Sequence, residues 1–191
     1  LFLLNAAGFL VITGLLLASR QGSWTQRLGL VRPARPAIVA SAALSIPIAV
    51  TLLWLAYRYG QLEQTNWTLL FRGFLIYPLW GIVQQIFLGP VLTVLLLASL
   101  GSGARPTPAL RLSVAILAAF VFATVHGPNF ALMSATFLIG ICWSYLYQRY
   151  GSIIPLAISH GILGSLFREL APSQFRMNGS VGLGHFEWLW F

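Results

Sequence analysis

The sequence contains no lysine, no aspartate and a single cysteine, Cys142. Its only acidic residues are three glutamates, Glu63, Glu169 and Glu187. One cysteine can form neither an intramolecular disulfide nor a cysteine-rich metal site, so Cys142 is predicted to be a small core residue of an apolar helix. Charged residues are 7% of the chain, whereas soluble domains carry about a quarter. A soluble globular domain is therefore excluded.

Long apolar runs are abundant instead. Hydrophobic residues make up 58% of the 191 positions, and the mean hydropathy is +0.84. Because a spanning helix needs about 20 apolar residues, the sequence predicts an all-α fold, a polytopic integral membrane helical bundle with about six transmembrane helices. We expect a single transmembrane domain over residues 1–170 and an interfacial aromatic tail over residues 171–191. The expected helices are Leu1–Ser19, Ala37–Tyr57, Phe74–Leu97 with an extension to about Leu100, Ala109–His126, Phe130–Tyr147 and Ile153–Leu170.

The positive charge comes from 11 arginines, which give a formal net charge of +8. They stand singly or in short loops between apolar runs, a pattern typical of loops at a lipid headgroup surface. A nucleic-acid-binding face would gather them into one patch, so nucleic acid is not a predicted partner. The predicted environment is the lipid bilayer, and we expect the bacterial cytoplasmic membrane.

Polar side chains inside the apolar runs are the candidates for a functional site. Gln84 and Gln85 lie near the middle of one run, where an amide without a partner is costly. His126 and His160 lie inside or at the end of two other runs and could face them. The sequence therefore predicts a site built from Gln84, Gln85, His126 and His160. Its supporting residues include Asn129, in the His-Gly-Pro-Asn turn that follows the fourth helix.

Small residues spaced four apart indicate where helices pack closely in a membrane. The last three expected helices each carry such a stripe, so we expect these three helices to form the tightest part of the bundle. The stripes are Ala115/Ala119/Ala123, Thr136/Gly140/Ser144 and Ala157/Gly161/Ser165.

Three short segments resemble a known family when they are read in chain order. They are QQIFLGP at 84–90, FATVH at 122–126 and HGILG at 160–164. Their order and helix context resemble the motifs E-E-x-x-x-R, F-x-x-x-H and H-x-x-x-N of the CAAX-protease and bacteriocin-processing (CPBP, or Abi) family. The resemblance covers about Trp67–Leu170. It implies a helical intramembrane protease in which a glutamate, assisted by histidines, activates water against a peptide bond of a membrane-anchored or prenylated substrate.

The match to these motifs is partial. Phe122, His126 and His160 stand where the family has the same residues. The glutamate pair is replaced by Gln84 and Gln85. In addition, Gly89 stands at the position of the arginine, and Gly164 at that of the asparagine. An amide cannot take a proton from water at neutral pH. The resemblance therefore predicts a divergent member with reduced or lost peptidase activity, which retains a Gln/His pocket inside the membrane.

Two other functions stay open at this point. The protein could be a non-catalytic subunit of a larger membrane complex that docks on other transmembrane helices. It could also be an active endopeptidase that cuts membrane-anchored or prenylated peptides with a histidine as the base.

No cofactor is predicted. Zinc, or a pigment ligated by a histidine, are the alternatives, but the two histidines lack a third protein ligand of the kind that zinc sites use.

Overall fold

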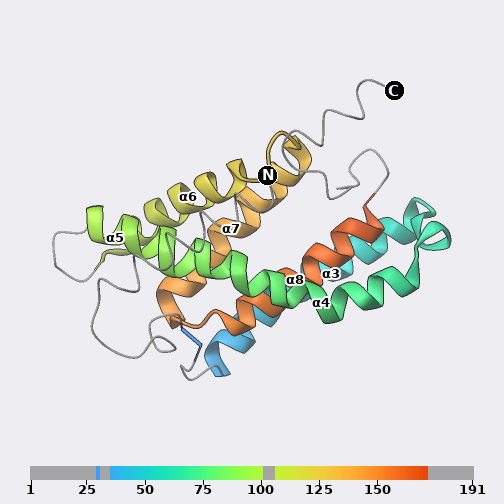
Figure 1. The fold of residues 1–191 in the computed structure, drawn as a ribbon, viewed down its shortest axis with the longest axis horizontal. Coiled ribbons are helices and arrows are strands. Elements are labelled where there is room, and N and C mark those ends of the chain that lie inside the picture. Colours follow the sequence, from blue (N-terminus) through green and yellow to red (C-terminus); the bar gives the residue numbers. More distant parts are fainter. Residues whose placement is uncertain (1–28, 31–34, 101–105, 172–191) are drawn as a thin grey trace.

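The computed structural model describes residues 29–30, 35–100 and 106–171, and Figure 1 shows their arrangement. This part of the chain is helical and contains no strand, so the expected all-α fold is confirmed. Two predicted elements, Leu1–Ser19 and the aromatic tail beyond Ala171, lie outside the described residues. The elements are α3 (Arg35–Arg58), the 3₁₀ helix η1 (Gln61–Gln64), α4 (Trp67–Ile86), the π-helical segment η2 (Phe87–Thr93), α5 (Val94–Leu100), α6 (Pro108–Thr124), α7 (Phe130–Tyr150) and α8 (Ile154–Leu170).

Within the described ranges, three helices are long and apolar enough to cross a membrane. They are α3, the 34-residue helix Trp67–Leu100 formed by α4, η2 and α5, and α7. α6 and α8 have 17 residues each, fewer than the roughly 20 that a full crossing needs. The expected number of six is therefore not confirmed. The expected third helix also begins earlier than predicted, at Trp67 rather than Phe74.

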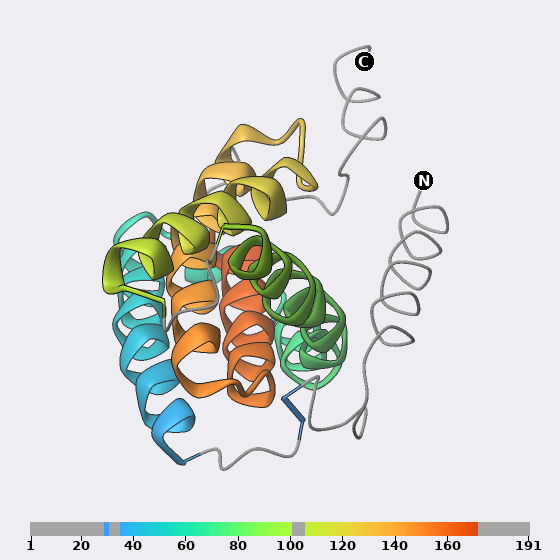
Figure 2. The ribbon, with the colours of Figure 1, turned by 90° about the vertical axis from the view of Figure 1, so that its left-hand side faces the viewer.

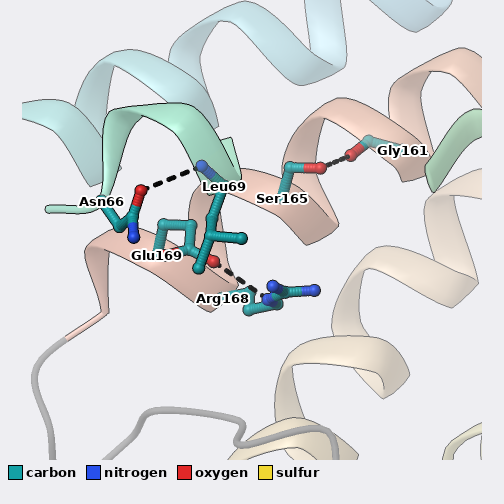
Figure 3. Close-up of polar contacts among 6 residues, drawn as sticks. All are labelled: Asn66, Leu69, Gly161, Ser165, Arg168 and Glu169. Atoms are coloured by element: carbon teal, nitrogen blue, oxygen red, sulfur yellow. Dashed lines mark hydrogen bonds and ion pairs between the residues drawn. The ribbon is translucent and has the colours of Figure 1, made fainter. Parts of the chain in front are cut away.

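Polar side chains cap the starts of three helices. Leu69 N–H donates to Asn66 Oδ1 at 3.1 Å before α4, and Leu132 N–H donates to Asn129 Oδ1 at 3.1 Å before α7. Thr107 caps α6 in the same way. Each bond satisfies a backbone N–H that has no partner inside its own helix. Figure 3 shows the cap of α4 beside the last turns of α8.

α4 and α8 pack closely and run antiparallel. A Cβ atom on Gly73 would lie 2.7 Å from Ser165 Oγ, and one on Gly81 would lie 2.6 Å from the Ala157 carbonyl oxygen. Later positions of α4 thus meet earlier positions of α8. α3 lies along the other side of α8, where Ser41 Oγ donates to the Pro155 carbonyl at 2.9 Å. Figure 1 shows α8 beside α3 and α4, and Figure 2 shows it beside α4.

The expected close packing of the last three helices is wrong for the last of them. α6 and α7 do pack on each other, and a Cβ on Gly140 would lie 3.2 Å from Ala119 Cβ. α8 packs mainly on α4 and α3 instead. Its small-residue stripe meets Gly73, Pro78 and Gly81 of α4, because these positions also allow a close backbone approach.

η2 is a wide turn in the middle of the long helix, at Pro90. Proline has no N–H to donate, and its ring crowds the preceding turn, so the regular α-helical bonding cannot continue through it. Thr93 Oγ1 donates to the Leu88 carbonyl at 2.7 Å, and Thr93 also shares a 2.8 Å hydrogen bond with Ser144 of α7. The part of the long helix that precedes η2, α4, packs on α8, whereas η2 itself packs on α6 and α7.

Candidate functional site

Gln85 lies on the face of α4 that packs against α8, with 1% of its surface exposed. Its amide Nε2 lies 3.3 Å from Nδ1 of His160. An amide nitrogen can only donate, so His160 Nδ1 is the acceptor. This bond gives the Gln85 side chain a partner inside the apolar bundle and links the end of α4 to α8.

His160 is held on its other side by an aromatic stack. Its ring lies 4.5 Å from the Trp143 ring of α7, at an interplanar angle of 16°. Trp143 Nε1 donates to Ser159 Oγ at 3.0 Å, and Ser159 shares a 2.6 Å hydrogen bond with Ser45 of α3. His160 therefore lies where α3, α4, α7 and α8 meet, and 6% of its surface is exposed.

Phe122 lies between the two histidines. Its ring centroid is 5.0 Å from that of His126 and 6.1 Å from that of His160, edge-on in both cases. His126 follows the end of α6, and its Nδ1 lies 3.0 Å from the Phe122 carbonyl oxygen. A carbonyl only accepts, so Nδ1–H donates there. His126 is 8% exposed.

Gln84 differs from its neighbour. Successive residues of an α-helix point about 100° apart, so the two amides do not face the same helix. Gln84 is half-buried, and its Oε1 is buried without a hydrogen bond within the described residues. The structure thus brings Gln85, Phe122, His126 and His160 together, and no bond joins Gln84 to them.

Two tyrosine rings cover the glycines that sequence analysis singled out. A Cβ atom on Gly89 would lie 2.8 Å from Cγ of Tyr147, and one on Gly164 would lie 2.9 Å from Cε1 of Tyr77. Neither position therefore has room for a side chain unless a ring moves. Asn129, the remaining supporting residue, caps α7.

A comparison with protein-family models finds a match over residues 67–166. The model describes the type II CAAX prenyl endopeptidase Rce1-like family, and the match covers just over half of the 191 residues. The chain belongs to this Rce1-like family. No curated protein and no solved structure matches the chain. The predicted resemblance to CAAX proteases is confirmed, and with the apolar helices it makes the chain an integral membrane protein with an intramembrane protease-like fold.

The Rce1-like match contains all four predicted site residues, but none of the carboxylates that the structure describes joins them. Of the two glutamates in the described ranges, Glu63 lies in η1, and Glu169 pairs with its neighbour Arg168 at 2.9 Å (Figure 3). The described residues also hold no group of three or more His, Cys, Asp or Glu side chains that could bind a metal ion. The retained groups are therefore two imidazoles and an amide, which can orient a ligand by hydrogen bonds.

Sequence analysis missed the aromatic partners of this site, Trp143, Tyr147 and Tyr77. Trp143 carried a signal, since a tryptophan in an apolar run needs an acceptor for its N–H. The two tyrosines carried no comparable signal, because ring packing on a glycine depends on which helices are neighbours.

Proposed function

We propose that this protein is a member of the Rce1-like family that no longer hydrolyses peptide bonds. Its Gln/His set joins the helices and contacts a membrane-anchored peptide without cutting it. The observation that carries the proposal is the bond between Gln85 Nε2 and His160 Nδ1, at 3.3 Å. At this position the resemblance predicts a carboxylate, and an amide is found there, with its donor already bound to a histidine.

An amide and a carboxylate have nearly the same shape but different chemistry. A carboxylate accepts a proton from water and carries negative charge against neighbouring donors, whereas an amide does neither. Exchange of glutamate for glutamine therefore preserves the packing of α4 on α8 while it removes the base. This explains how Gln85 can be buried and hydrogen-bonded at a site without hydrolysis.

The two covered glycines support the same proposal. With Tyr147 against Gly89 and Tyr77 against Gly164, the volumes beside these backbones are filled by aromatic rings. An arginine or an asparagine there would provide hydrogen-bond donors for a developing negative charge. The rings provide packing in place of those donors.

Hydrolysis with a histidine base is the competing function, and one observation favours it. Because His126 Nδ1 donates to the Phe122 carbonyl, neutral His126 carries its lone pair on Nε2, as a general base must. A non-catalytic subunit of a larger complex would also lack hydrolysis, and it would copurify with its partners in a fixed ratio.

The test is cleavage of a panel of membrane-anchored peptides by the purified protein in lipid vesicles. We expect no cleavage by the natural protein and a gain of at least about tenfold over background in Gln84→Glu/Gln85→Glu, since a restored base contributes 10²–10⁴-fold in many enzymes. Gln64→Glu, the same change at an exposed residue of η1, is the matched control and should gain nothing. Cleavage by the natural protein that disappears in His126→Ala would refute the proposal and identify a histidine base.

A further inference from the structure

A row of hydrogen bonds connects α3 to the aromatic side of the site. Trp143 Nε1 donates to Ser159 Oγ at 3.0 Å, and Ser159 shares a 2.6 Å bond with Ser45. Ser45 Oγ donates in turn to the Ser41 carbonyl oxygen at 2.7 Å. All four residues are buried, with at most 8% of their surface exposed. We call Ser45 and Ser159 the serine bridge, because they join α3 to α7 across α8.

Only one arrangement of the hydroxyl protons makes all three of these bonds. The indole N–H only donates and the Ser41 carbonyl only accepts, so both ends of the row are fixed. Each serine hydroxyl carries one proton. Because the proton of Ser45 goes to the carbonyl, the proton of Ser159 goes to Ser45 Oγ. The serine bridge therefore holds the Ser159 oxygen as an acceptor for Trp143.

The Trp143 ring fixes a property of His160 that the bond from Gln85 does not fix. The torsion that rotates an imidazole about its Cβ–Cγ bond has broad minima, and the 3.3 Å distance to Gln85 is long for a hydrogen bond. That bond determines which edge of the ring faces α4. The stack on Trp143, with centroids 4.5 Å apart and an interplanar angle of 16°, determines the plane of the ring. A rotation of the indole would therefore turn the imidazole or break the stack.

The serine bridge begins in a helix that the Rce1-like match does not include. The match covers residues 67–166, whereas α3 spans Arg35–Arg58. A buried serine of a helix can satisfy its hydroxyl without a second helix, as Ser165 does by donating to the Gly161 carbonyl of α8 (Figure 3). Ser45 already has such a bond within α3, so its second bond, to α8, is not needed to satisfy its own proton.

We infer that α3 positions the site: Ser45, acting through Ser159, holds the Trp143 indole against the imidazole of α8. Ser45 and Trp143 are positioning residues, since they act through His160. The inference rests on the proposed function, in which His160 contacts a membrane-anchored peptide, and it identifies the segment that fixes the imidazole for that contact.

The test is NMR of the full chain in lipid vesicles, with labelled tryptophan and histidine. The signals of the two rings are assigned by their absence from Trp143→Phe and from His160→Gln. In the natural protein we expect the indole N–H proton downfield and protected from exchange with D₂O, because it is buried and hydrogen-bonded. We expect the carbon-bound protons of His160 upfield, because they lie over the face of an aromatic ring.

Ser45→Ala should release the indole, although Ser45 is hydrogen-bonded to neither ring. We expect the indole proton to move upfield and to exchange about fivefold faster, the factor that corresponds to one net hydrogen bond. The His160 protons should move downfield as the stack loosens. Ser45→Thr keeps the hydroxyl and should retain the natural signals.

Ser41→Ala is the matched control. It removes another buried hydroxyl that joins α3 to α8, through the 2.9 Å bond to the Pro155 carbonyl, but it leaves the backbone carbonyl at which the row ends. Both rings should therefore keep their signals. Equal changes in Ser41→Ala and Ser45→Ala would show that the serines only pack α3 on α8, and would overturn the inference.

Natural signals in Ser45→Ala would overturn the inference as well. The cleavage assay is independent of these signals. Hydrolysis by the natural protein contradicts the proposed function alone when Ser45→Ala still releases the indole.

Discussion

Two pairs of helices in the described part of the chain are packed through small residues, and they differ in their polar contacts, because only α4 and α8 place an amide against an imidazole. α6 and α7 meet through alanines and Gly140. α4 and α8 meet through glycines that are approached even more closely, and at the end of α4 they add the bond between Gln85 and His160. Both pairs satisfy the same rule of close backbone approach in a membrane.

The difference between the pairs indicates what the polar residues are for. α6 and α7 also share an amide bond, from Gln148 Nε2 to the Arg111 carbonyl at 2.9 Å, but it lies away from their small-residue contact at Gly140 and Ala119 and involves no imidazole. In α4 and α8 the amide and the imidazole must be paired to be tolerated, and they add little stability beyond that. Both residues lie within the part of the chain that matches the Rce1-like family, in keeping with the site proposed above.

The largest effect is expected at the closest approach of α4 and α8. In Gly161→Ala the new Cβ would lie 2.5 Å from Pro78 Cγ and 2.6 Å from Pro78 N. Because backbone cannot move aside as a side-chain tip can, the helices must separate, and we expect a loss of about 3 kcal/mol in the free energy of unfolding. Unfolding in mixed detergent micelles measures it. Ile158→Ala, on the exposed face of the same helix, should cost much less. Equal losses in both variants would contradict the assigned packing.

A smaller effect is expected from the polar bond. Gln85→Leu removes the donor to His160 Nδ1 and leaves that atom buried without a partner, which should cost about 1 kcal/mol in the free energy of unfolding. Gln84→Leu is the matched control, and it should cost nothing, because the Gln84 Oε1 has no hydrogen bond within the described residues. A larger loss in the free energy of unfolding for Gln84→Leu than for Gln85→Leu would show that the hydrogen bond to His160 comes from the other amide.

The smallest effect is expected between α6 and α7. A Cβ on Gly140 would meet Ala119 Cβ at 3.2 Å, which the neighbours can relieve by a shift of a few tenths of an ångström. Gly140→Ala should therefore change the free energy of unfolding by less than about 1 kcal/mol. The same micelle titration measures it beside Gly161→Ala. A loss in Gly140→Ala as large as the loss in Gly161→Ala would show that the two pairs of helices do not differ in how closely their backbones approach.

The positions of the helices could be predicted from hydropathy, because each helix is an apolar run bounded by polar, charged or turn-forming residues. The expected Ala37–Tyr57 and Ile153–Leu170 agree with α3 and α8 to within two residues at either end. The pairing of helices could not be predicted in the same way. A stripe of small residues indicates that another helix packs against it, but it does not identify that helix. The stripe on α8 therefore predicts packing on α6 and α7, whereas α8 packs on α4 and α3.

The candidate site was predictable in part. Buried polar residues are rare enough in such a sequence to be noticed, and Gln85, His126 and His160 do lie around Phe122. Which of two adjacent glutamines would face the histidine depends on the rotation of α4, which its uniformly apolar sequence leaves open. The orientation of each imidazole depends on a carbonyl and an amide that only the folded chain brings near.

The π-helical turn at Phe87–Thr93 lets one long helix contact α8 before the turn and α7 at the turn. Regular α winding through all the residues present would rotate everything before this turn by about 100° relative to everything after it, because a π turn holds one residue more than an α turn. Gln85 could then face His160, or Thr93 could face Ser144, but the chain could not keep both bonds. The wide turn therefore sets the angular phase between the half of the helix that carries the site and the half that packs on α7, and straightening it at constant chain length would uncouple them.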